Sequence, residues 1–135
     1  NANKKIFFDR TDSISKHCHI QNEEEVFNYL KNKGFSKYQL TKLSFFEKIY
    51  LFENAEIIVG AHGAGLTNLV FCKPKTKVIE IRPSINFNTV YERISYINNL
   101  NYRLIQTKKL DKNQEKLGDI YLSINELEHS IKSFN

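Results

Sequence analysis

The sequence has few cysteines, no long apolar run and none of the commonest nucleotide-binding glycine patterns. Its two cysteines, Cys18 and Cys72, are far apart, which excludes a disulfide framework and a cysteine metal site and favours two reduced thiols in a cytosolic protein. No apolar run approaches the ~20 residues of a membrane span, and the start shows no charged-then-apolar leader. We therefore expect a cytoplasmic protein, with the inner face of the membrane as the other location to consider.

The chain also lacks a concentrated charge pattern. Its 135 residues carry a net charge of +5, with 41% hydrophobic and 26% charged residues, as expected of one globular domain over 1–135. The lysines are scattered, and the acidic run 23–25 interrupts the positive field. We therefore predict no nucleic-acid partner, and a positive surface suits a phosphate-bearing small molecule equally well.

Strand-like and helix-like segments alternate along the chain without an internal repeat. Short apolar runs predict strands, and amphipathic segments between them predict helices. This alternation is typical of βαβ units, so we predict an α/β fold: a Rossmann-like three-layer α/β/α arrangement with a mostly parallel sheet. Such sheets bind ligands at the carboxyl ends of their strands. The strands are expected over 6–8, 35–40, 56–59, 78–81, 102–106 and, as a short sixth strand, 120–122.

Four helices are expected to begin at a capping residue that is followed three positions later by glutamate. The pairs are Asn22 with Glu25, Ser44 with Glu47, Thr89 with Glu92 and Ser123 with Glu126. The spacing of apolar residues then predicts which side chains face the core. These are Phe45, Ile49 and Phe52 in the second helix, Val90, Ile94 and Ile97 in the fourth, and Ile124, Leu127, Ile131 and Phe134 in the last.

The most informative segment is Gly60–Asn68, which reads Gly-Ala-His-Gly-Ala-Gly-Leu-Thr-Asn. It follows the apolar run Ile57–Val59, and the apolar residues after it suit a helix. Glycines let a backbone turn tightly and approach a ligand, and a helix N-terminus offers N–H groups and a favourable dipole to an anion. Glycines at 60, 63 and 65 match neither the Walker A loop nor the dinucleotide fingerprint. The segment therefore predicts an anion site of another kind.

An ordered series of short motifs, from about residue 5 to residue 83, carries a family resemblance. It resembles the C-terminal, donor-binding half of glycosyltransferase family 61, which includes bacterial capsular polysaccharide biosynthesis proteins and eukaryotic xylosyl- and N-acetylglucosaminyltransferases. The remaining third of the chain matches in segment pattern only. The motifs are Arg10, 22–26, Gly34-Phe35, 43–47, 51–55, 58–68, Phe71 and 78–81.

The resemblance implies a GT-B glycosyltransferase, in which two Rossmann-like domains face each other across a cleft. It implies an inverting enzyme that transfers a sugar from a nucleotide-sugar, expected to be UDP-linked, to a glycan or polysaccharide, as in bacterial capsule synthesis. No metal or other cofactor is expected, and the absence of an Asp-x-Asp motif agrees with this. An N-terminal acceptor domain would be the partner of this domain, which we expect to be inactive by itself.

The leaving nucleoside diphosphate of such an enzyme needs positive partners placed in advance. In the glycine-rich segment, Gly63, Ala64 and Gly65 would supply backbone N–H donors, and Thr67 and Asn68 would add side-chain hydrogen bonds. The alternative is a tight turn in which Thr67 is an ordinary helix cap.

Four further side chains are candidates for donor binding. His62 would contact a phosphate or the sugar, with general-base catalysis as a weaker candidate role; the alternative is a structural histidine held by a neighbouring carbonyl. Glu80 would accept hydrogen bonds from ribose hydroxyls, or would pair with Arg82 or a nearby lysine. Arg10 would contact phosphate or sugar, or else an acidic side chain. Lys16 would supply charge where family members often carry arginine, without the planar fork of that side chain.

Two rival functions stay open. A non-catalytic nucleotide-binding or assembly module of the same fold is favoured by Lys16 and by Lys48, which stands where family members usually carry glutamine. A nucleotide-dependent oxidoreductase fragment would need an acidic residue after the second strand, and none is well placed over 40–44.

Overall fold

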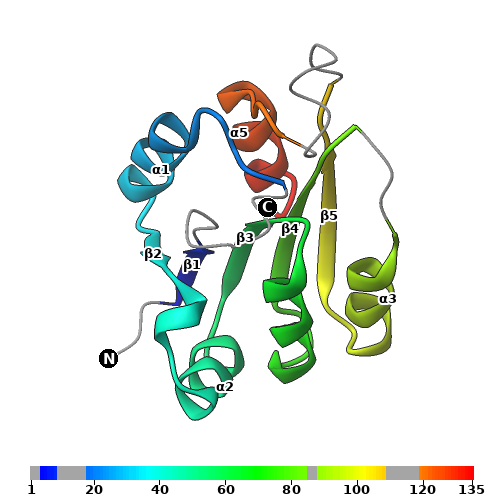
Figure 1. Ribbon diagram of the computed structural model, residues 1–135. Coiled ribbons are helices and arrows are strands. Elements are labelled where there is room, and N and C mark those ends of the chain that lie inside the picture. Colours follow the sequence, from blue (N-terminus) through cyan, green and yellow to red (C-terminus); the bar gives the residue numbers. More distant parts are fainter. Residues whose placement is uncertain (1–3, 9–17, 85–87, 109–118) are drawn as a thin grey trace.

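The computed structural model describes residues 4–8, 18–84, 88–108 and 119–135. Its centre is a five-stranded sheet in the order β2-β1-β3-β4-β5, and every pair of neighbouring strands is parallel (Figure 1). The strands are β1 (Lys5–Phe8), β2 (Ser36–Tyr38), β3 (Ile57–Ala61), β4 (Lys77–Arg82) and β5 (Asn101–Gln106). The helices are α1 (Glu23–Asn32), α2 (Phe45–Glu53), α3 (Val90–Ile97) and α5 (Ile124–Lys132), with 3₁₀ helices η1 (Leu40–Lys42) and η2 (Ala64–Phe71).

Helices cover both faces of the sheet, which confirms the predicted α/β fold. On one face, Val59 and Ile79 pack in an apolar core with side chains of α1 and α5. On the other face, Ile58 and Val78 pack with α2, η2 and α3. Because β3 and β4 are buried on both sides, their sequences read as nearly continuous apolar runs. This double burial is why the strands stood out in the sequence.

The strand order places the glycine-rich segment at a reversal of the chain's path. From β1 the chain goes outward to the edge strand β2, and then returns to β3 on the other side of β1. Ligands of parallel sheets bind where the strand order reverses, at the carboxyl ends of the strands. His62 and the residues after it leave β3 at that point.

The expected sixth strand is wrong. Residues 120–122 form no strand of the sheet; Ile120 makes an isolated parallel bridge to Ile20. Asn22 joins the same two segments, since its Nδ2 donates to the Leu122 carbonyl over 2.8 Å and its Oδ1 accepts from the Leu122 N–H over 3.0 Å. The predicted cap at Asn22 is therefore also wrong, because its side chain hydrogen-bonds the backbone of Leu122 and makes no capping hydrogen bond to α1.

Of the three other predicted helix caps, those of α2 and α5 are confirmed and that of α3 is wrong. Ser44 and Glu47 form a reciprocal capping box at α2, and the Ser123 Oγ accepts from the Glu126 N–H. Thr89 makes no side-chain cap, because Asn88 takes that role and accepts from the Val90 N–H over 3.1 Å.

The predicted inward faces hold for α5 and fail in part for α2 and α3. Leu127 is buried in α5, and Phe52 is buried in α2, but Phe45 is 62% exposed. In α3 the buried residues are Tyr91 and Ser95, whereas Ile97 is 78% exposed. The helix turns Tyr91 toward the sheet, and of the predicted stripe only Ile94 packs against the core, where it is partly buried.

Three further features complete the fold. The second strand is shorter than expected, because η1 begins at Leu40. Cys18 and Cys72 are both buried, and neither is part of a disulfide. Burial raises the pKa of the Cys72 thiol to about 12. Among the helices that the structure describes, none combines the length and the apolar character needed to cross a bilayer.

Candidate functional site

The predicted helix after the glycine-rich segment is present as the 3₁₀ helix η2. Its buried residues, Leu66 and Leu69, are three positions apart, as a three-residue turn requires. Its first hydrogen bond runs from the Leu66 N–H to the Gly63 carbonyl, over 3.0 Å. The N–H groups of Ala64 and Gly65 come before this bond and have no partner within the helix. Among the hydrogen bonds of the described residues neither group has a backbone acceptor, and such N–H groups at a helix start suit anion binding.

Two of the three glycines are explained by packing inside the protein. A Cβ on Gly60 would lie 2.3 Å from Cζ of the Phe8 ring, and a Cβ on Gly65 would lie 3.0 Å from Cδ1 of Leu40. The sequence assigned these glycines to close approach of a ligand. The structure instead shows β1 and η1 side chains occupying the space that a Cβ would fill at Gly60 and Gly65.

Thr67 and Asn68 bond to their own helix. The Thr67 hydroxyl donates to the Ala64 carbonyl over 2.7 Å, and the Asn68 amide donates to the Gly65 carbonyl over 2.9 Å. Thr67 therefore does not act as an N-cap, because its hydroxyl binds a carbonyl three residues back. The ligand roles of both side chains stay predictions.

His62 and Glu80, which the sequence offered as separate candidates, are brought together. The register pairs Gly60 of β3 with Glu80 of β4, and His62 leaves β3 two residues later. Its Nδ1 lies 2.5 Å from Oε2 of Glu80, whose side chain is fully buried, while 13% of the His62 side chain is exposed. An ionised Glu80 can only accept, so this contact assigns the ring proton to Nδ1 and directs Nε2 away from Glu80.

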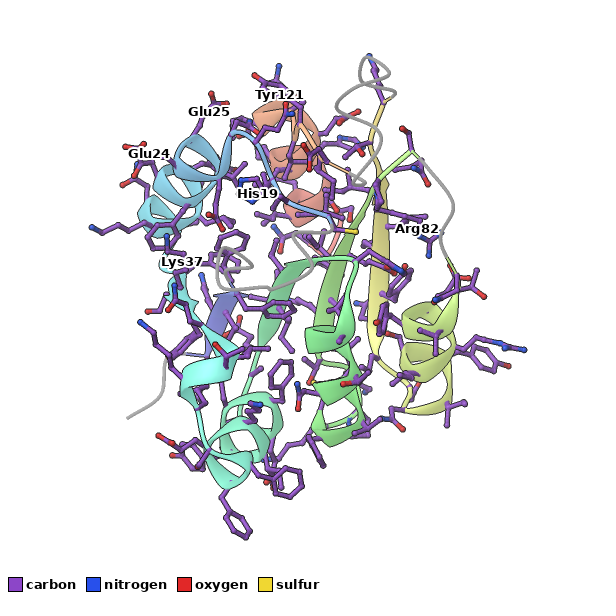
Figure 2. The ribbon with its side chains drawn as sticks, viewed as in Figure 1. His19, Glu24, Glu25, Lys37, Arg82 and Tyr121 are labelled. Atoms are coloured by element: carbon purple, nitrogen blue, oxygen red, sulfur yellow. The ribbon has the colours of Figure 1, made fainter. Side chains whose placement is uncertain are left out.

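The second oxygen of Glu80 has two partners that sequence reasoning missed as site residues. Tyr102, at the start of β5, donates its hydroxyl to Oε1, and Nη2 of Arg82 lies 3.4 Å from the same atom. Burial, followed by the hydrogen bond to Glu80 and the charge of that carboxylate, raises the pKa of Tyr102 above its ordinary range. Arg82 lies at the carboxyl end of β4 (Figure 2).

This buried polar cluster of His62, Glu80, Arg82 and Tyr102 lies under α3. The Tyr91 ring packs edge-on against the imidazole, with ring centroids 5.0 Å apart. Tyr102 could have been found from the sequence only with the register, which pairs it with Val78 and so puts it on the Glu80 face. The sequence offered Glu80 two roles, ribose binding or pairing with Arg82. The structure shows the pairing, at 3.4 Å between Nη2 of Arg82 and Oε1 of Glu80.

The other sequence candidates lie elsewhere. Arg10 and Lys16 are outside the described residues, so their roles stay predictions. Glu24 and Glu25 of the acidic run point outward from α1 (Figure 2). Within the described ranges, no group of three or more His, Cys, Asp or Glu residues could hold a metal ion.

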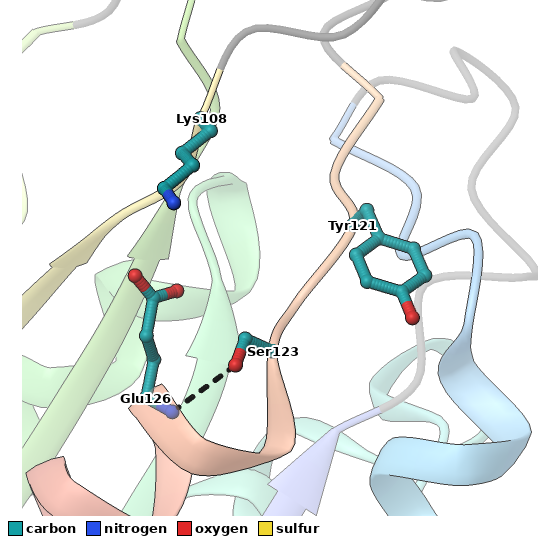
Figure 3. Close-up of a pocket in the computed structure, with 4 residues that line it drawn as sticks. All are labelled: Lys108, Tyr121, Ser123 and Glu126. Atoms are coloured by element: carbon teal, nitrogen blue, oxygen red, sulfur yellow. Dashed lines mark hydrogen bonds between the residues drawn. The ribbon is translucent and has the colours of Figure 1, made fainter.

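A hollow of about 380 Å³ lies at the carboxyl end of β5. It is lined by Lys108, Tyr121, Ser123 and Glu126, and the Ser123 cap of α5 forms part of its wall (Figure 3). It shares the edge of the sheet at which the glycine-rich segment lies, but no residue of the buried polar cluster lines it.

Comparison with known proteins agrees with these features. The sequence model of glycosyltransferase family 61 matches residues 1–79. The chain belongs to this family. It is 32% identical over 125 residues to a β-1,2-xylosyltransferase of Oryza sativa subsp. japonica, a match that covers 85% of the chain. It is 36% identical over 73 residues to a β-1,2-xylosyltransferase of Arabidopsis thaliana, covering 44% of the chain.

A mouse relative widens the range of transferases. The chain is 33% identical over 67 residues, 46% of its length, to an EGF domain-specific O-linked N-acetylglucosamine transferase of Mus musculus. The matches span only 22%, 14% and 13% of the rice, Arabidopsis and mouse proteins, respectively. The family predicted from the motif series is confirmed. Its capsular branch and the C-terminal position of the domain stay predictions.

Proposed function

We propose that this chain is the donor-binding domain of a glycosyltransferase that moves a sugar from a UDP-linked nucleotide-sugar to a glycan or polysaccharide. The observation that carries the proposal is the start of η2. In a family 61 chain, the N–H groups of Ala64 and Gly65 precede the first helical hydrogen bond at the reversal of strand order. His62, immediately before this turn, adds a ring nitrogen to the same edge.

The proposed chemistry is stabilisation of the leaving nucleoside diphosphate. Negative charge develops on that group as the bond between the sugar and the diphosphate breaks. Hydrogen-bond donors that are fixed in advance stabilise this charge without reorganisation. The backbone N–H groups and Nε2 of His62 would serve in this way, and Arg10 and Lys16 would add positive charge. We propose that no metal is required. Glu80 would hold His62, a role that replaces the ribose contact considered from the sequence.

The proposed setting is a two-domain GT-B enzyme of the inverting type. The acceptor would bind an N-terminal domain of the same protein across a cleft, and this domain would not transfer sugar by itself. A role in bacterial capsule synthesis, at a cytoplasmic site or at the inner face of the membrane, is the most specific form of the proposal, and it rests on the motif resemblance alone.

Nucleotide titration combined with turnover tests the proposal. Calorimetry of this chain with uridine and guanosine diphosphates should show binding, with uridine preferred. The polypeptide that carries both domains should hydrolyse or transfer sugar from a UDP-sugar in the presence of EDTA, and His62→Ala should reduce that rate. A folded chain that binds neither nucleotide, together with unchanged turnover in His62→Ala, contradicts the proposal.

The non-catalytic module remains the second candidate, because Lys48 stands on α2 where family members usually carry glutamine. It predicts nucleotide binding without turnover by the two-domain polypeptide, and measured turnover would exclude it. The oxidoreductase alternative loses its support, since η1 follows β2 with Leu40, Thr41 and Lys42 and offers no acidic residue for a ribose.

A further inference from the structure

The buried polar cluster contains more groups than anion binding requires. Glu80 is fully buried, and a buried carboxylate is stable only when its oxygens are matched by donors. Its Oε2 meets His62, and its Oε1 meets Tyr102 and Arg82. Oε2 therefore has one partner and Oε1 has two, and together they fix the rotation of the carboxylate about its last bond.

This arrangement determines which nitrogen of His62 is free to meet a ligand. With Nδ1–H directed at Oε2 of Glu80, the imidazole is held by the carboxylate and also packs edge-on against the Tyr91 ring. Loss of the Tyr102 hydroxyl would leave Oε1 with Arg82 as its remaining donor in the cluster, at 3.4 Å. The carboxylate could then turn, and the imidazole would lose its fixed partner.

We propose that Tyr102 and Glu80 are positioning residues of the donor site: Tyr102 fixes the Glu80 carboxylate, and Glu80 holds the Nδ1–H of His62 so that Nε2 faces the diphosphate. The ligand in this statement rests on the proposed function, whereas the Tyr102–Glu80–His62 chain does not. The arrangement explains a tyrosine at the start of β5 whose hydroxyl crosses to the neighbouring strand.

The hydrogen bonds that link Tyr102, Glu80 and His62 predict two opposite shifts in the titration of the His62 imidazole. The groups around the ring in the described residues are Glu80 and Arg82 of β4, Tyr102 of β5 and Tyr91 of α3, with the charge of Glu92 acting on Tyr102. The Tyr102 hydroxyl turns the positive end of its dipole toward the cluster, so its removal favours the imidazolium. Removal of the Glu80 charge favours the neutral ring.

Nitrogen-15 NMR of the labelled 135-residue chain measures both effects, with His62→Asn identifying the His62 signals among those of the four histidines. In the unmodified chain the neutral ring should carry its proton on Nδ1. Tyr102→Phe should move the titration midpoint to higher pH by about half a pH unit or more. Glu80→Gln should move it to lower pH by about one pH unit. Tyr96→Phe removes an exposed hydroxyl from α3 and should move nothing.

The proposal is overturned if the neutral ring carries its proton on Nε2, or if Tyr102→Phe leaves the midpoint unchanged. Tyr102→Phe keeps the ring and its packing, so it decides the question even if Glu80→Gln does not fold. Failure of the proposed function has a different signature: the midpoint shifts appear, but uridine diphosphate does not bind. If uridine diphosphate binds and the shifts are absent, the donor site stands and the positioning chain does not.

Discussion

The two faces of β4 are built from alternate residues and have different chemistry. Ile79 and Ile81 enter the apolar core beneath α1 and α5. Glu80 and Arg82 face α3 and meet His62 there. These four residues of β4 are all buried, with at most 4% of any one exposed. The difference is therefore one of chemistry and not of burial, and a parallel strand covered on both faces has no need of charged residues for folding.

The comparison separates a stabilising face from a functional one. Apolar side chains gain free energy simply by leaving water, whereas a buried ion pair is weak evidence for stability because its desolvation offsets the attraction. Apolar burial on both faces, with Ile79 and Ile81 on one and Ile58 and Val78 on the other, thus explains why the sheet forms, and Glu80 and Arg82 have no part in it. Glu80 and Arg82 lie next to the start of η2, and the proposed function assigns them to support of the donor site there.

Ile79→Ala should break the apolar face and leave the polar face working. Removal of a buried isoleucine side chain at a fully buried position leaves a cavity and should lower the free energy of unfolding by about 2–5 kcal/mol. Urea denaturation measures the loss, and Ile79→Val, with a loss of about 1 kcal/mol, is the graded control. A change in nucleotide affinity of the folded fraction as large as that caused by His62→Ala would contradict the separation.

Gly60→Ala should test the contact beneath the glycine-rich segment. The added Cβ would meet the Phe8 ring at 2.3 Å, and overpacking of this kind costs about 1–3 kcal/mol. Thermal unfolding should show the loss. If the clash with Phe8 is the cause, Phe8→Leu should relieve it, so that the double variant loses less than the sum of the two single variants. Additive losses would assign the cost of Gly60→Ala to the backbone instead.

Ser44→Ala should have a smaller effect, at the start of α2, which packs on the same side of the sheet as α3. The Ser44 Oγ accepts from the Glu47 N–H over 3.1 Å, and loss of such a cap costs about 1 kcal/mol. Thr89→Ala is the matched control, because Thr89 makes no side-chain cap at α3, and it should change stability by no more than a few tenths of a kcal/mol. Equal losses in the two variants would contradict the difference between these caps.

The smallest expected effect is a pH dependence from the same capping box. The hydrogen bond from the Ser44 backbone, followed by the bond to its side chain, lowers the pKa of Glu47. A carboxylate with a lowered pKa in the folded state stabilises the fold above its unfolded-state pKa, and this contribution is lost as pH falls through its folded-state pKa. Melting temperatures of Glu47→Gln should therefore fall less steeply than those of the unmodified chain below about pH 5. Parallel curves would show that this carboxylate is not coupled to folding.

The fold was predictable because its signals are local. Apolar runs such as Ile57–Val59 mark buried strands, and alternation with helices implies a parallel sheet. The cap at Ser44 was found for the same reason, since its partner is three residues away. Asn22 has an equally good capping signature, but its amide binds Leu122, at the other end of the sequence, and no local pattern can contain that partner.

The candidate site was predictable only in its first half. The glycine-rich segment was recognisable from its composition, and Glu80 was recognisable as a charged residue in an apolar strand. Their contact depends on the β3–β4 register, and the part played by Tyr102 depends on the β4–β5 register as well. Registers are set by packing between segments, so the buried polar cluster could not be assembled from the sequence alone.

The most direct test of the central claim is the dissociation constant of uridine diphosphate for the unmodified chain and for His62→Asn. Asparagine keeps an N–H donor near Glu80 and removes Nε2, so the fold and the carboxylate partner are both preserved. We predict about tenfold weaker binding, the value of one lost hydrogen bond to a charged group, with unfolding unchanged. Equal dissociation constants for the two proteins would contradict it, because the polar face of β4 would then have no part in holding the donor.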